Sequence, residues 1–430
     1  MIYENKTVPR LRFPEFKNDG EWKFINGDKL FDTISNKSHN SDLPVLAITQ
    51  EYGAIPRDMI DYSVSVTDKS IESYKVVEKG DFIISLRSFQ GGIEYSNYKG
   101  ICSPAYIILR KTNKNDVDNF FKFYFKTDVF IQDLNKNLEG IRDGKMVSYK
   151  QFSEILLPKP EPQEQQKIAS CLSSLDELIA AENQKLETLK THKKGLMQQL
   201  FPTEGETVPK LRFAEFRDSG EWEEITLIDV TNKKIKWSFI GGPFGSNLKA
   251  SDYVTEGIRV IQLQNIGDGE FINKYKIFTS EEKANELLSC NIYPGDIILS
   301  KMGDPVGRAC LIPNIHARYV MCSDGIRLVV DEKKFNKYFI YSLINSDQFR
   351  GLIEKTATGS TRKRIGLDDL KNLPFVVPGK IEEQQKIASC LSSLDLLIVA
   401  QSQKTEALKV HKKGLMQGLF PAMSATGFAG

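Results

Sequence analysis

Two basic stretches of the sequence have residue types that suit a contact with nucleic acid. They are "EGIRDGKMV" at 139–147 and "TGSTRKRIG" at 358–366. Arginine reads guanine or holds phosphate through its planar fork, and lysine and hydroxyl groups serve phosphate or base edges. An ordinary solvated loop is the alternative for each stretch. The candidate residues are Arg142, Lys145, Thr361, Arg362, Lys363 and Arg364.

Further candidates lie in stretches that carry side-chain amides, which pair with adenine in DNA. These stretches are "SLRSFQGG" at 85–92 and "IQLQNIGDG" at 261–269, and a lysine follows the apolar run "GDIILS" at 295–300. A solvated loop is again the alternative. The candidate residues are Arg87, Gln90, Gln262, Gln264, Asn265 and Lys301.

The sequence lacks the motifs by which many enzymes are recognised. There is no GxxxxGK[ST] phosphate loop, no GxSxG nucleophile elbow and no HExxH zinc motif. The cysteines and histidines do not have the spacing of a metal site. The glycine-rich "GGPFGS" at 241–246 is predicted to be a turn. We therefore predict a binding subunit with no catalytic residue, no metal and no cofactor of its own.

Length and composition describe a globular protein of at least two domains. A chain of 430 residues is too long for one ordinary core. No stretch approaches the ~20 apolar residues of a membrane span, and the N-terminus lacks an apolar signal core, so we expect a cytoplasmic protein. With a net charge of only +2, a DNA-binding chain must concentrate positive charge on particular faces or share the contact with a partner.

Two sequence repeats form the elements that must position these residues. "EQQKIASCLSSLD" occurs at 164–176 and again at 383–395, and both copies continue to "HKKGLMQ" at an offset of 219. "VPRLRFPEFKNDGEW" at 8–22 matches "VPKLRFAEFRDSGEW" at 208–222 at an offset of 200. The blocks between the repeats show little resemblance to each other. A duplicated frame with divergent inserts predicts a scaffold that presents two different recognition surfaces.

The longer repeat has the apolar spacing of a coiled coil. Apolar residues recur at alternating spacings of four and three over about four heptads, and the seam becomes polar at Glu182 and Gln401 and at Lys193 and Lys412. Because one chain tethers both copies, we expect the helices to pair with each other in antiparallel orientation. A device that joins separate chains is the alternative. The seam residues are Ile168, Leu172, Leu175, Ile179, Leu186, Leu189, Ile387, Leu391, Leu394, Ile398 and Leu408.

The blocks between the repeats have mixed α and β patterns. "GDFIISLRS" at 80–88 and "GDIILSKMG" at 295–303 are strand-like, and the stretches 119–134 and 335–353 have helical spacing. We predict an α+β fold with two mixed α/β domains, separated by two long helices that form an antiparallel coiled coil.

The complete layout resembles the specificity subunit of type I restriction-modification systems. The matching segments include the "LRFPEF" and "GEW" opening, "GDIILSKMGDPVGRACLI" at 295–312 and "GSTRKRIGLDDLKNLPF" at 359–375. The most specific match is the Glu-Gln segment that leads into a long helix ending in "KKGLMQ" and "LFP". The resemblance covers nearly the whole chain. It is weaker in the first half, where "DFIISLRSFQGGIEYS" departs from the form of that family.

The resemblance implies four segments and a tail. Target recognition domains would occupy 1–157 and 203–376, spacer helices would occupy 158–202 and 377–421, and the tail at 422–430 is expected to be disordered. Each domain would read one half of a bipartite DNA site, and the helix pair would set the spacer. The N-terminal segment would pack near the C-terminal helix, which gives pseudo-twofold symmetry.

The resemblance also implies partners. These are double-stranded DNA, two modification (methyltransferase) subunits and, where restriction occurs, two restriction subunits. S-adenosylmethionine would bind to the methyltransferase, and ATP and Mg to the restriction subunit. A coiled-coil adaptor or assembly protein without base reading is the main alternative. The missing motifs count against a stand-alone nuclease or methylase.

Overall fold

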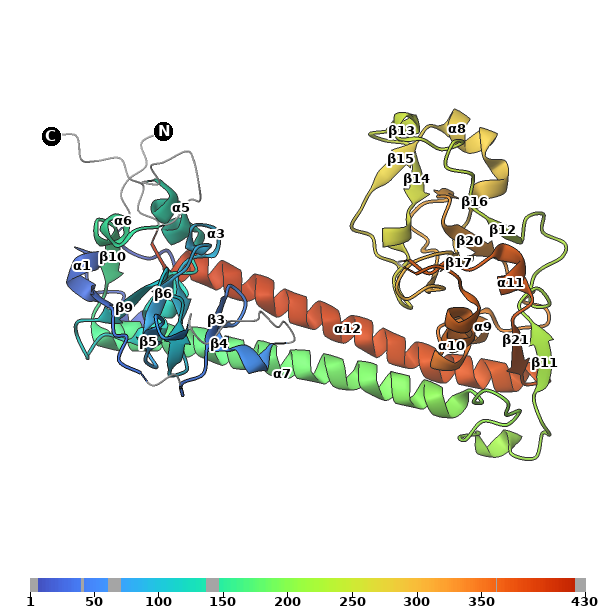
Figure 1. The fold of residues 1–430 in the computed structure, drawn as a ribbon, viewed down its shortest axis with the longest axis horizontal. Helices are drawn as coiled ribbons and strands as arrows, with labels where there is room; N and C mark the ends of the chain where they lie inside the picture. The colour runs from blue at the N-terminus through green and yellow to red at the C-terminus, as the bar shows by residue number, and fades with distance from the viewer. Residues whose placement is uncertain (1–6, 40–41, 61–70, 137–146, 361, 422–430) are drawn as a thin grey trace. The chain divides into compact units, whose positions relative to one another are not determined.

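The chain forms two compact units (Figure 1). The computed structural model describes residues 7–39, 42–60, 71–136, 147–360 and 362–421. The tail that was expected to be disordered lies outside these residues. Unit 1 comprises Met1–Asn183 and Gln403–Gly430, and unit 2 comprises Gln184–Ser402. Each unit therefore contains one of the dissimilar blocks and a part of both long helices.

The two long helices are α7 (Pro162–Leu200) and α12 (Ile381–Leu419), each 39 residues long. At 1.5 Å per residue, each extends about 58 Å. A proline occupies the first position of α7, where its missing N–H costs nothing. Both helices end at the leucine of a Leu-Phe-Pro segment, because the proline two residues later cannot continue a helix.

Ion pairs show how the helices pack in unit 1. Lys412 Nζ lies 2.5 Å from Asp176 Oδ1, and Lys404 Nζ lies 2.5 Å from Glu182 Oε1. Residue numbers that rise along α7 fall along α12, so the helices are antiparallel, which confirms the predicted pairing (Figure 1).

Unit 2 contains the repeat-equivalent pair. Lys193 Nζ lies 2.6 Å from Asp395 Oδ1, and both residues are displaced by 219 from Lys412 and Asp176. The polar seam positions Lys193 and Lys412 therefore each pair with an aspartate of the opposite helix. This arrangement specifies register, which is the usual role of polar residues in an apolar seam.

The predicted seam positions are all buried or half-buried, whereas several large apolar residues elsewhere on the helices are exposed. Leu178, Leu396 and Leu397 are 42%, 72% and 55% exposed. The buried seam residues are Ile168, Leu172, Ile387 and Leu391. The half-buried ones are Leu175, Ile179, Leu186, Leu189, Leu394, Ile398 and Leu408.

Unit 1 contains a small antiparallel sheet whose apolar face is covered by short helices. The sheet has the order β2-β9-β6-β7, and the pairs β1-β10, β3-β4 and β5-β8 lie beside it. Phenylalanine rings fill the core; Phe31 and Phe121, for example, meet edge to face with centroids 5.1 Å apart. The strands are β1 (Lys23–Asn26), β2 (Phe31–Ile34), β3 (Leu46–Thr49), β4 (Gly53–Pro56), β5 (Lys75–Val77), β6 (Phe82–Ile84), β7 (Glu94–Tyr95), β8 (Gly100–Cys102), β9 (Ile107–Lys111) and β10 (Leu156–Lys159). The helices are α1 (Gly27–Leu30), α3 (Ser88–Gly91), α4 (Asp118–Tyr124), α5 (Asp128–Lys136) and α6 (Tyr149–Ser153).

Unit 2 contains two sheets, with orders β12-β20-β17-β18 and β13-β15-β14-β19-β16, and the pair β11-β21. One apolar core lies between the first sheet and the helices. A second core is formed mainly by residues on and beside the strands of the other sheet. The strands are β11 (Glu223–Thr226), β12 (Phe239–Gly241), β13 (Tyr253–Val254), β14 (Ile258–Ile261), β15 (Ile277–Thr279), β16 (Asn291–Ile292), β17 (Ile297–Ser300), β18 (Ala309–Leu311), β19 (Tyr319–Met321), β20 (Gly325–Leu328) and β21 (Pro374–Val377). The helices are α8 (Glu281–Glu286), α9 (Lys337–Ile344), α10 (Asp347–Thr356) and α11 (Leu367–Lys371).

Each stretch with helical spacing contains two helices rather than one. In unit 1 the break lies between α4 and α5, where the Thr127 hydroxyl donates to the Tyr124 carbonyl at 2.7 Å and accepts from the Phe130 amide at 3.3 Å. In unit 2 the Ser346 hydroxyl ends α9 and caps α10 in the same way. The apolar periodicity conceals these breaks because both helices of each pair pack on one core.

The structural repeat extends beyond the sequence repeat. Thr127 and Ser346 are 219 positions apart, as are the fully buried rings of Phe120 and Phe339. The ladders β1-β10 and β11-β21 are also both antiparallel and occupy the same place in their units. The duplicated frame therefore includes the helices and edge strands of the dissimilar blocks, and the divergence is concentrated in the other strands and loops.

Three properties bear on function in a general way. Within the described part of the chain, no helix is sufficiently long and apolar to span a membrane, and no group of three or more His, Cys, Asp or Glu residues is arranged to hold a metal. The six cysteines are free. Burial raises the pKa of Cys310 to about 12, so this thiol stays protonated and unreactive at neutral pH.

Candidate functional site

The first turn of α7 anchors the N-terminal segment of unit 1. Arg12 donates through Nε and Nη2 to the two carboxylate oxygens of Glu164, both at 2.8 Å, and the Trp22 indole donates to Glu164 at 3.0 Å. Arg12 also donates to the Gly20 carbonyl at 2.5 Å. The hydrogen bond to Glu164 raises the pKa of Arg12. One buried carboxylate therefore fixes both ends of the segment that opens this half.

The same anchor occurs in unit 2. Arg212 forms two bonds of 2.8 Å with Glu383, Trp222 donates to Glu383 at 3.2 Å, and Arg212 donates to the Gly220 carbonyl at 2.5 Å. The glutamates are the first residues of the repeated "EQQKIASCLSSLD". The sequence repeat thus encodes a repeated three-way contact.

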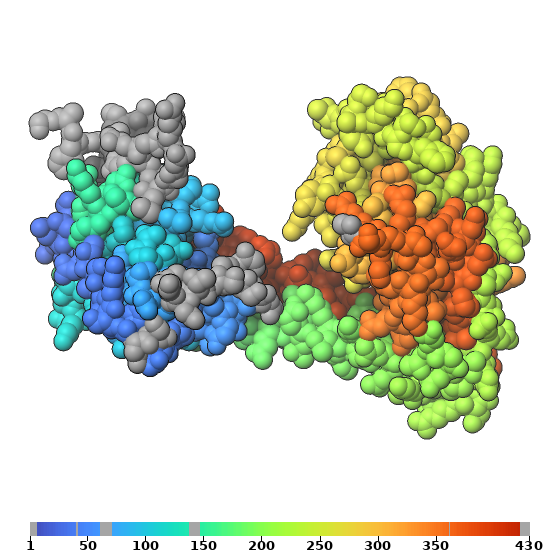
Figure 2. Space-filling view, viewed as in Figure 1, coloured from blue at the N-terminus to red at the C-terminus, as the bar shows by residue number. Residues whose placement is uncertain are grey.

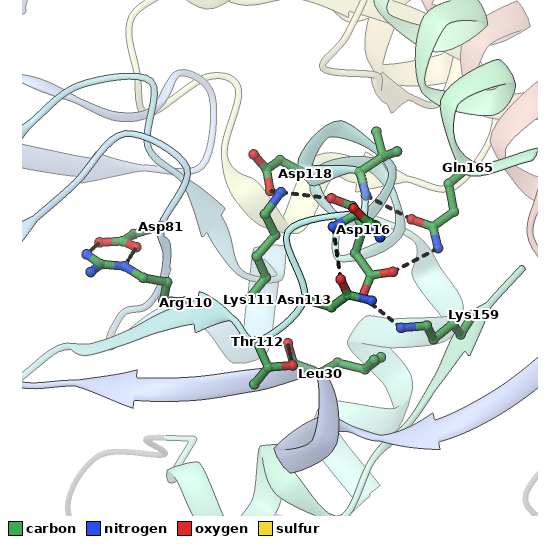
Figure 3. Close-up of polar contacts among 12 residues, drawn as sticks. Leu30, Asp81, Arg110, Lys111, Thr112, Asn113, Asp116, Asp118, Lys159 and Gln165 are labelled. Atoms are coloured by element: carbon green, nitrogen blue, oxygen red, sulfur yellow. Dashed lines mark hydrogen bonds and ion pairs between the residues drawn. The ribbon is translucent and has the colours of Figure 1, made fainter. Parts of the chain in front are cut away.

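The following glutamine anchors the recognition block itself (Figure 3). In unit 1, Gln165 accepts from the Val117 amide at 2.9 Å and donates to the Pro160 carbonyl at 2.9 Å and to Asp116 at 3.4 Å. Lys159 adds an ion pair with Asp116 at 2.9 Å. The amide therefore ties the start of α4 to the start of α7.

Gln384 makes the corresponding contacts in unit 2. It accepts from the Asn336 amide at 2.9 Å and donates to the Pro378 carbonyl at 3.1 Å. Both glutamines are buried. Because backbone groups are the partners in both units, this anchor tolerates different side chains in the two blocks.

The end of each long helix receives an N-terminal segment. The Leu11 amide donates to the Gly418 carbonyl of α12 at 2.8 Å in unit 1, and the Leu211 amide donates to the Gln199 carbonyl of α7 at 2.9 Å in unit 2. Gln199 and Gly418 are 219 positions apart. In unit 1 this hydrogen bond joins the N-terminal part of the chain to the C-terminal end of α12. In unit 2 the equivalent bond joins the C-terminal end of α7 to the segment that follows this helix in the sequence.

Polar side chains surround a surface groove in unit 2. The groove has a volume of about 740 Å³. Segments far apart in sequence meet there, and the orange segment at about 350–370 lies at the surface of unit 2 (Figure 2). The groove lining includes Phe244, Gln262, Gln264, Arg308, Asp324 and Arg362.

Phe244 is displayed by a tightly held turn. Its side chain is 82% exposed. The turn is closed by the Asn247 amide, which donates to the Phe244 carbonyl at 2.8 Å, and is joined to β20 through a 2.8 Å bond from the Gly242 amide to the Gly325 carbonyl. A Cβ atom on Gly242 would lie 1.7 Å from the Cys322 carbonyl oxygen, so only glycine permits this approach.

The amide cluster has two roles. Gln264 donates to the Gln262 side-chain oxygen at 2.9 Å at the groove wall. Asn265 is fully buried; it accepts from the Gln262 backbone amide at 2.9 Å and donates to the carbonyls of Ile272 and Tyr275 at 2.9 and 3.2 Å. The expectation that Asn265 contacts DNA does not fit this burial, because its side chain is bonded to the Gln262 backbone amide and to two carbonyls.

The basic cluster of unit 2 is divided by its contacts. Arg362 lines the groove. Arg364 pairs with Asp324 at 2.8 Å, and Lys363 pairs with Glu354 at 2.5 Å. The bond from Lys363 lowers the pKa of Glu354. Thr361 lies outside the described residues.

Lys301 is half-buried and follows strand β17. Its amide donates to the Asp324 carbonyl at 2.6 Å, and its carbonyl accepts from the Ile365 amide at 3.0 Å. The backbone of Lys301 therefore connects two of the segments near the groove.

In unit 1, two of the predicted candidates follow strand β6, just as Lys301 follows strand β17 in unit 2. Arg87 and Gln90 are exposed and follow strand β6. The aspartate before each of these strands is fixed by an arginine of the neighbouring strand: Asp81 by Arg110 at 2.7 and 2.8 Å (Figure 3), and Asp296 by Arg327 at 2.7 Å in unit 2. The other two candidates, Arg142 and Lys145, lie outside the described residues.

Sequence reasoning missed Phe244 and Arg308. Arg308 lines the groove, and its Nε atom is buried without a hydrogen-bond partner among the described residues. An aromatic residue between glycines in a predicted turn was an available signal, because such a turn offers no core for the ring to enter. No comparable signal distinguished Arg308 from other arginines. The groove presents hydrogen-bond donors, acceptors and the aromatic rings of Phe244 and Tyr253, which suit recognition of a polar, flat ligand.

Comparison with known proteins identifies the family. The chain matches the family described as "Methylase_S: Type I restriction modification DNA specificity domain" over residues 10–191 and 220–410. It is 26% identical over 428 residues to the type I restriction enzyme MjaVIII specificity subunit of Methanocaldococcus jannaschii, covering 96% of this chain and 93% of that protein. It is 24% identical to the putative MjaX specificity subunit of the same organism, covering 96% of both chains.

Two solved structures share the fold. One is the S subunit of a type I restriction-modification system from M. genitalium, with a TM-score of 0.54, 17% identity and coverage of 97% of this chain and 100% of the other. The second comes from work on complex assembly and conformational transition of the type I R-M system, with a TM-score of 0.55, 17% identity and coverage of 94% and 98%. The chain therefore belongs to the type I restriction-modification DNA specificity family and is a specificity (S) subunit, the non-catalytic component of such a system.

Proposed function

We propose that each unit reads one half of a bipartite site in double-stranded DNA and that the helix pair sets the unread spacer. One observation carries this proposal: an equivalent frame, anchored at Glu164 and Glu383, holds two dissimilar recognition blocks. A duplicated frame suits two like partners, and dissimilar blocks suit an asymmetric DNA sequence. The divisions at 1–157, 158–202, 203–376 and 377–421 remain part of this proposal.

The chemistry of the groove supports base reading by unit 2. Arginine is the commonest reader of guanine, and glutamine pairs with adenine. Arg308 and Arg362 supply the first chemistry, and Gln262 and Gln264 supply the second. Lys363 and Lys301 are assigned to phosphate, because a compact ammonium group positions the backbone rather than reading a base.

The proposed reader in unit 1 is less complete. Arg87 and Gln90 are exposed beside β6, and Arg142 and Lys145 remain predicted contacts. The modest net charge of +2 agrees with a chain that shares its contact with DNA among partner subunits, because strong non-specific binding requires many basic residues.

The length of the helices supports a spacer role. Each extends about 58 Å, and DNA completes a turn in ~34 Å. Two readers on one face of DNA require a separation of that order. Insertions that lengthen both helices therefore provide a direct test.

The repeated frame suits two modification subunits that dock at equivalent sites. In the proposed complex, S-adenosylmethionine binds to the methyltransferase subunits, which methylate adenine in each half-site, and this chain binds no cofactor. Restriction subunits, where present, add ATP- and Mg-dependent cleavage. The complex acts on the DNA of the cytoplasm.

Methylation mapping tests the proposal. The chain is expressed with its neighbouring methyltransferase in a host that lacks adenine methylases, and the DNA is read by long-read sequencing. A single bipartite motif with one methylated adenine in each half is expected. The methyltransferase alone is the control, and it should methylate no such motif.

A different outcome favours the second candidate function. A soluble complex that leaves DNA unmethylated, and that binds no sequence preferentially, would make this chain an adaptor that assembles partners without reading bases. The seam and the repeated anchors would then serve assembly alone.

A further inference from the structure

The groove of unit 2 contains two features that are chemically suited to contact a base pair. One is the hydrogen-bonded pair of Gln262 and Gln264, and the other is the exposed ring of Phe244. All three residues line one groove, and hydrogen bonds to the backbone hold Phe244 and Gln262. We infer that this groove reads an adenine–thymine pair in the major groove, with the glutamine pair on adenine and Phe244 on the thymine methyl group. The inference rests on the proposed function.

The first step concerns the glutamine pair. The 2.9 Å bond from Gln264 Nε2 to Gln262 Oε1 uses one donor and one acceptor. Gln262 Nε2 remains a donor, and Gln264 Oε1 remains an acceptor. Adenine presents the complementary arrangement in the major groove, an acceptor at N7 beside a donor at N6. The two side chains together thus offer what a single glutamine offers when it binds adenine with two bonds.

The second step decides which groove of DNA is read. In the minor groove an adenine–thymine pair presents only acceptors, at adenine N3 and thymine O2. Gln264 Oε1 would then face another acceptor. The thymine methyl group also lies in the major groove. Both the amides and the ring are therefore useful on that side of the duplex.

The third step concerns Phe244. An aromatic ring that is 82% exposed gains little from the protein core, whereas a thymine methyl group offers an apolar partner. The turn of Phe244 is fixed by the Gly242 and Asn247 hydrogen bonds, both 2.8 Å. A turn whose backbone is fixed before binding loses little backbone conformational entropy on contact. Among exposed aromatic residues, those on rigid turns are best suited to such a contact.

The fourth step concerns support for the amides. The buried Asn265 holds the Gln262 backbone amide at 2.9 Å and is itself bonded to two carbonyls. Asn265 is therefore a positioning residue, which fixes the short turn that carries both glutamines. Polar side chains used for recognition require such support if they are to discriminate between bases.

The experiment uses the complex of this chain with its methyltransferase and duplex DNA that carries the mapped bipartite site. Each thymine of both half-sites is replaced in turn by deoxyuridine, which lacks only the methyl group. With the wild-type complex, one replacement is expected to weaken binding about fourfold, the value for one buried methyl group. Replacing the paired adenine with 7-deazaadenine should also weaken binding, because it removes the N7 acceptor.

The variants assign the effect to the residues. Phe244→Ala should bind the thymine and uracil duplexes equally, and Gln262→Ala should lose the sensitivity to 7-deazaadenine, because Gln262 Nε2 is the donor assigned to adenine N7. Ile315→Ala removes another exposed apolar side chain of unit 2, 55% exposed, that is not part of the groove lining. This control should retain the full response to uracil.

The possible outcomes distinguish a failure of the base-pair assignment from a failure of the proposed function. A specific wild-type complex that is indifferent to every uracil, or whose sensitivity survives in Phe244→Ala, overturns the base-pair assignment alone. A wild-type complex that prefers no bipartite site overturns the proposed function and the assignment with it.

Discussion

Arg12 and Glu164 form a two-point ion pair, with both nitrogen–oxygen distances at 2.8 Å, although 152 residues separate them. The side chains are only 7% and 3% exposed. The same geometry recurs between Arg212 and Glu383. The pair joins the opening segment of each half to the first turn of a long helix, so it holds together two repeated segments of the frame.

Breaking this pair in unit 1 should be costly. Glu164→Ala leaves the Arg12 guanidinium and the Trp22 indole buried without their acceptor, and the loss is expected to be about 3 kcal/mol. Thermal or urea-induced unfolding of the purified chain measures it. Limited proteolysis should also cut the N-terminal segment faster in the variant.

An exposed ion pair on the same helix supplies the control. Glu15 pairs with Lys167 at 2.9 Å, with side chains 44% and 49% exposed. Solvent screens such a pair, so Glu15→Ala should leave unfolding nearly unchanged. Equal losses in both variants would mean that the buried anchor has no special role.

The long helices could be predicted from the sequence because their signal is local and periodic. The spacing from Ile168 to Leu189 specifies one face of a helix, and the exact repeat indicates that the second copy has the same partner surface. The Glu-Gln dipeptide was visible as a motif. Its role was not predictable, since Arg12 and Glu164 are distant in sequence and meet only in the fold.

The extent of the structural repeat was hidden for a different reason. Tyr124 of α4 and Leu343 of α9 are repeat-equivalent and both buried, yet they share no chemistry beyond apolar volume. Cores tolerate such exchanges when volume and pattern are kept. For Asn265 the residue type misled the prediction, because an asparagine suggests base reading. Only the fold shows that its side-chain amide donates to two backbone carbonyls.

Glu94 should make the stability of unit 1 depend on pH. Its side chain is 2% exposed and pairs with Lys126 at 2.5 Å, and Lys126 also bonds to the Gly91 carbonyl at the end of α3. Burial raises the pKa of Glu94 above 4.5, although Lys126 opposes the shift. The folded state therefore binds the proton more tightly than the unfolded state. The stabilising contribution of protonated Glu94 to the folded state is fully present below pH 4.5. It is lost as the pH rises through the raised pKa of Glu94.

The comparison with Glu94→Gln isolates this effect. Thermal unfolding of both proteins is measured from pH 7 to pH 5. The wild type should gain stability relative to the variant as the pH falls, because only the wild type takes up the proton. A difference between the two that does not change with pH would contradict the assignment.

Arg362 and Arg364 should behave differently in DNA binding. Arg362 lines the groove, and Arg362→Ala should lose about 1–3 kcal/mol at one position of the half-site read by unit 2. Arg364 is paired with Asp324 at 2.8 Å, so Arg364→Ala should disturb the position of the loop and weaken recognition less selectively. Binding is measured by competition with site variants at fixed salt concentration.

Unrelated DNA provides the control for both arginines. If Arg362→Ala weakens binding to unrelated DNA as much as to the mapped site, Arg362 is a phosphate contact. Lys363→Ala serves as a neighbouring variant, since Lys363 is paired with Glu354 at 2.5 Å. It should reduce the salt dependence of binding without changing the preferred sequence.

Insertions in the long helices test the spacer. The boundary between the units falls after Asn183 in α7 and after Ser402 in α12, and these positions are 219 residues apart. Three heptads added at both positions lengthen each helix by about 32 Å, close to one DNA turn of ~34 Å. The unread spacer should therefore grow by about one turn, with both half-sites unchanged. Methylation mapping of the variant complex measures the spacer directly.

A single heptad in both helices is the matched comparison. It adds about 10 Å, which corresponds to about three base pairs and turns the second half-site by roughly 100° around the DNA axis. This complex must twist the DNA to engage both half-sites, so its methylation should be slower than that of the three-heptad variant. An unchanged spacer in an active three-heptad variant would show that the helices do not measure the DNA, because the seam would have lengthened without moving either reader.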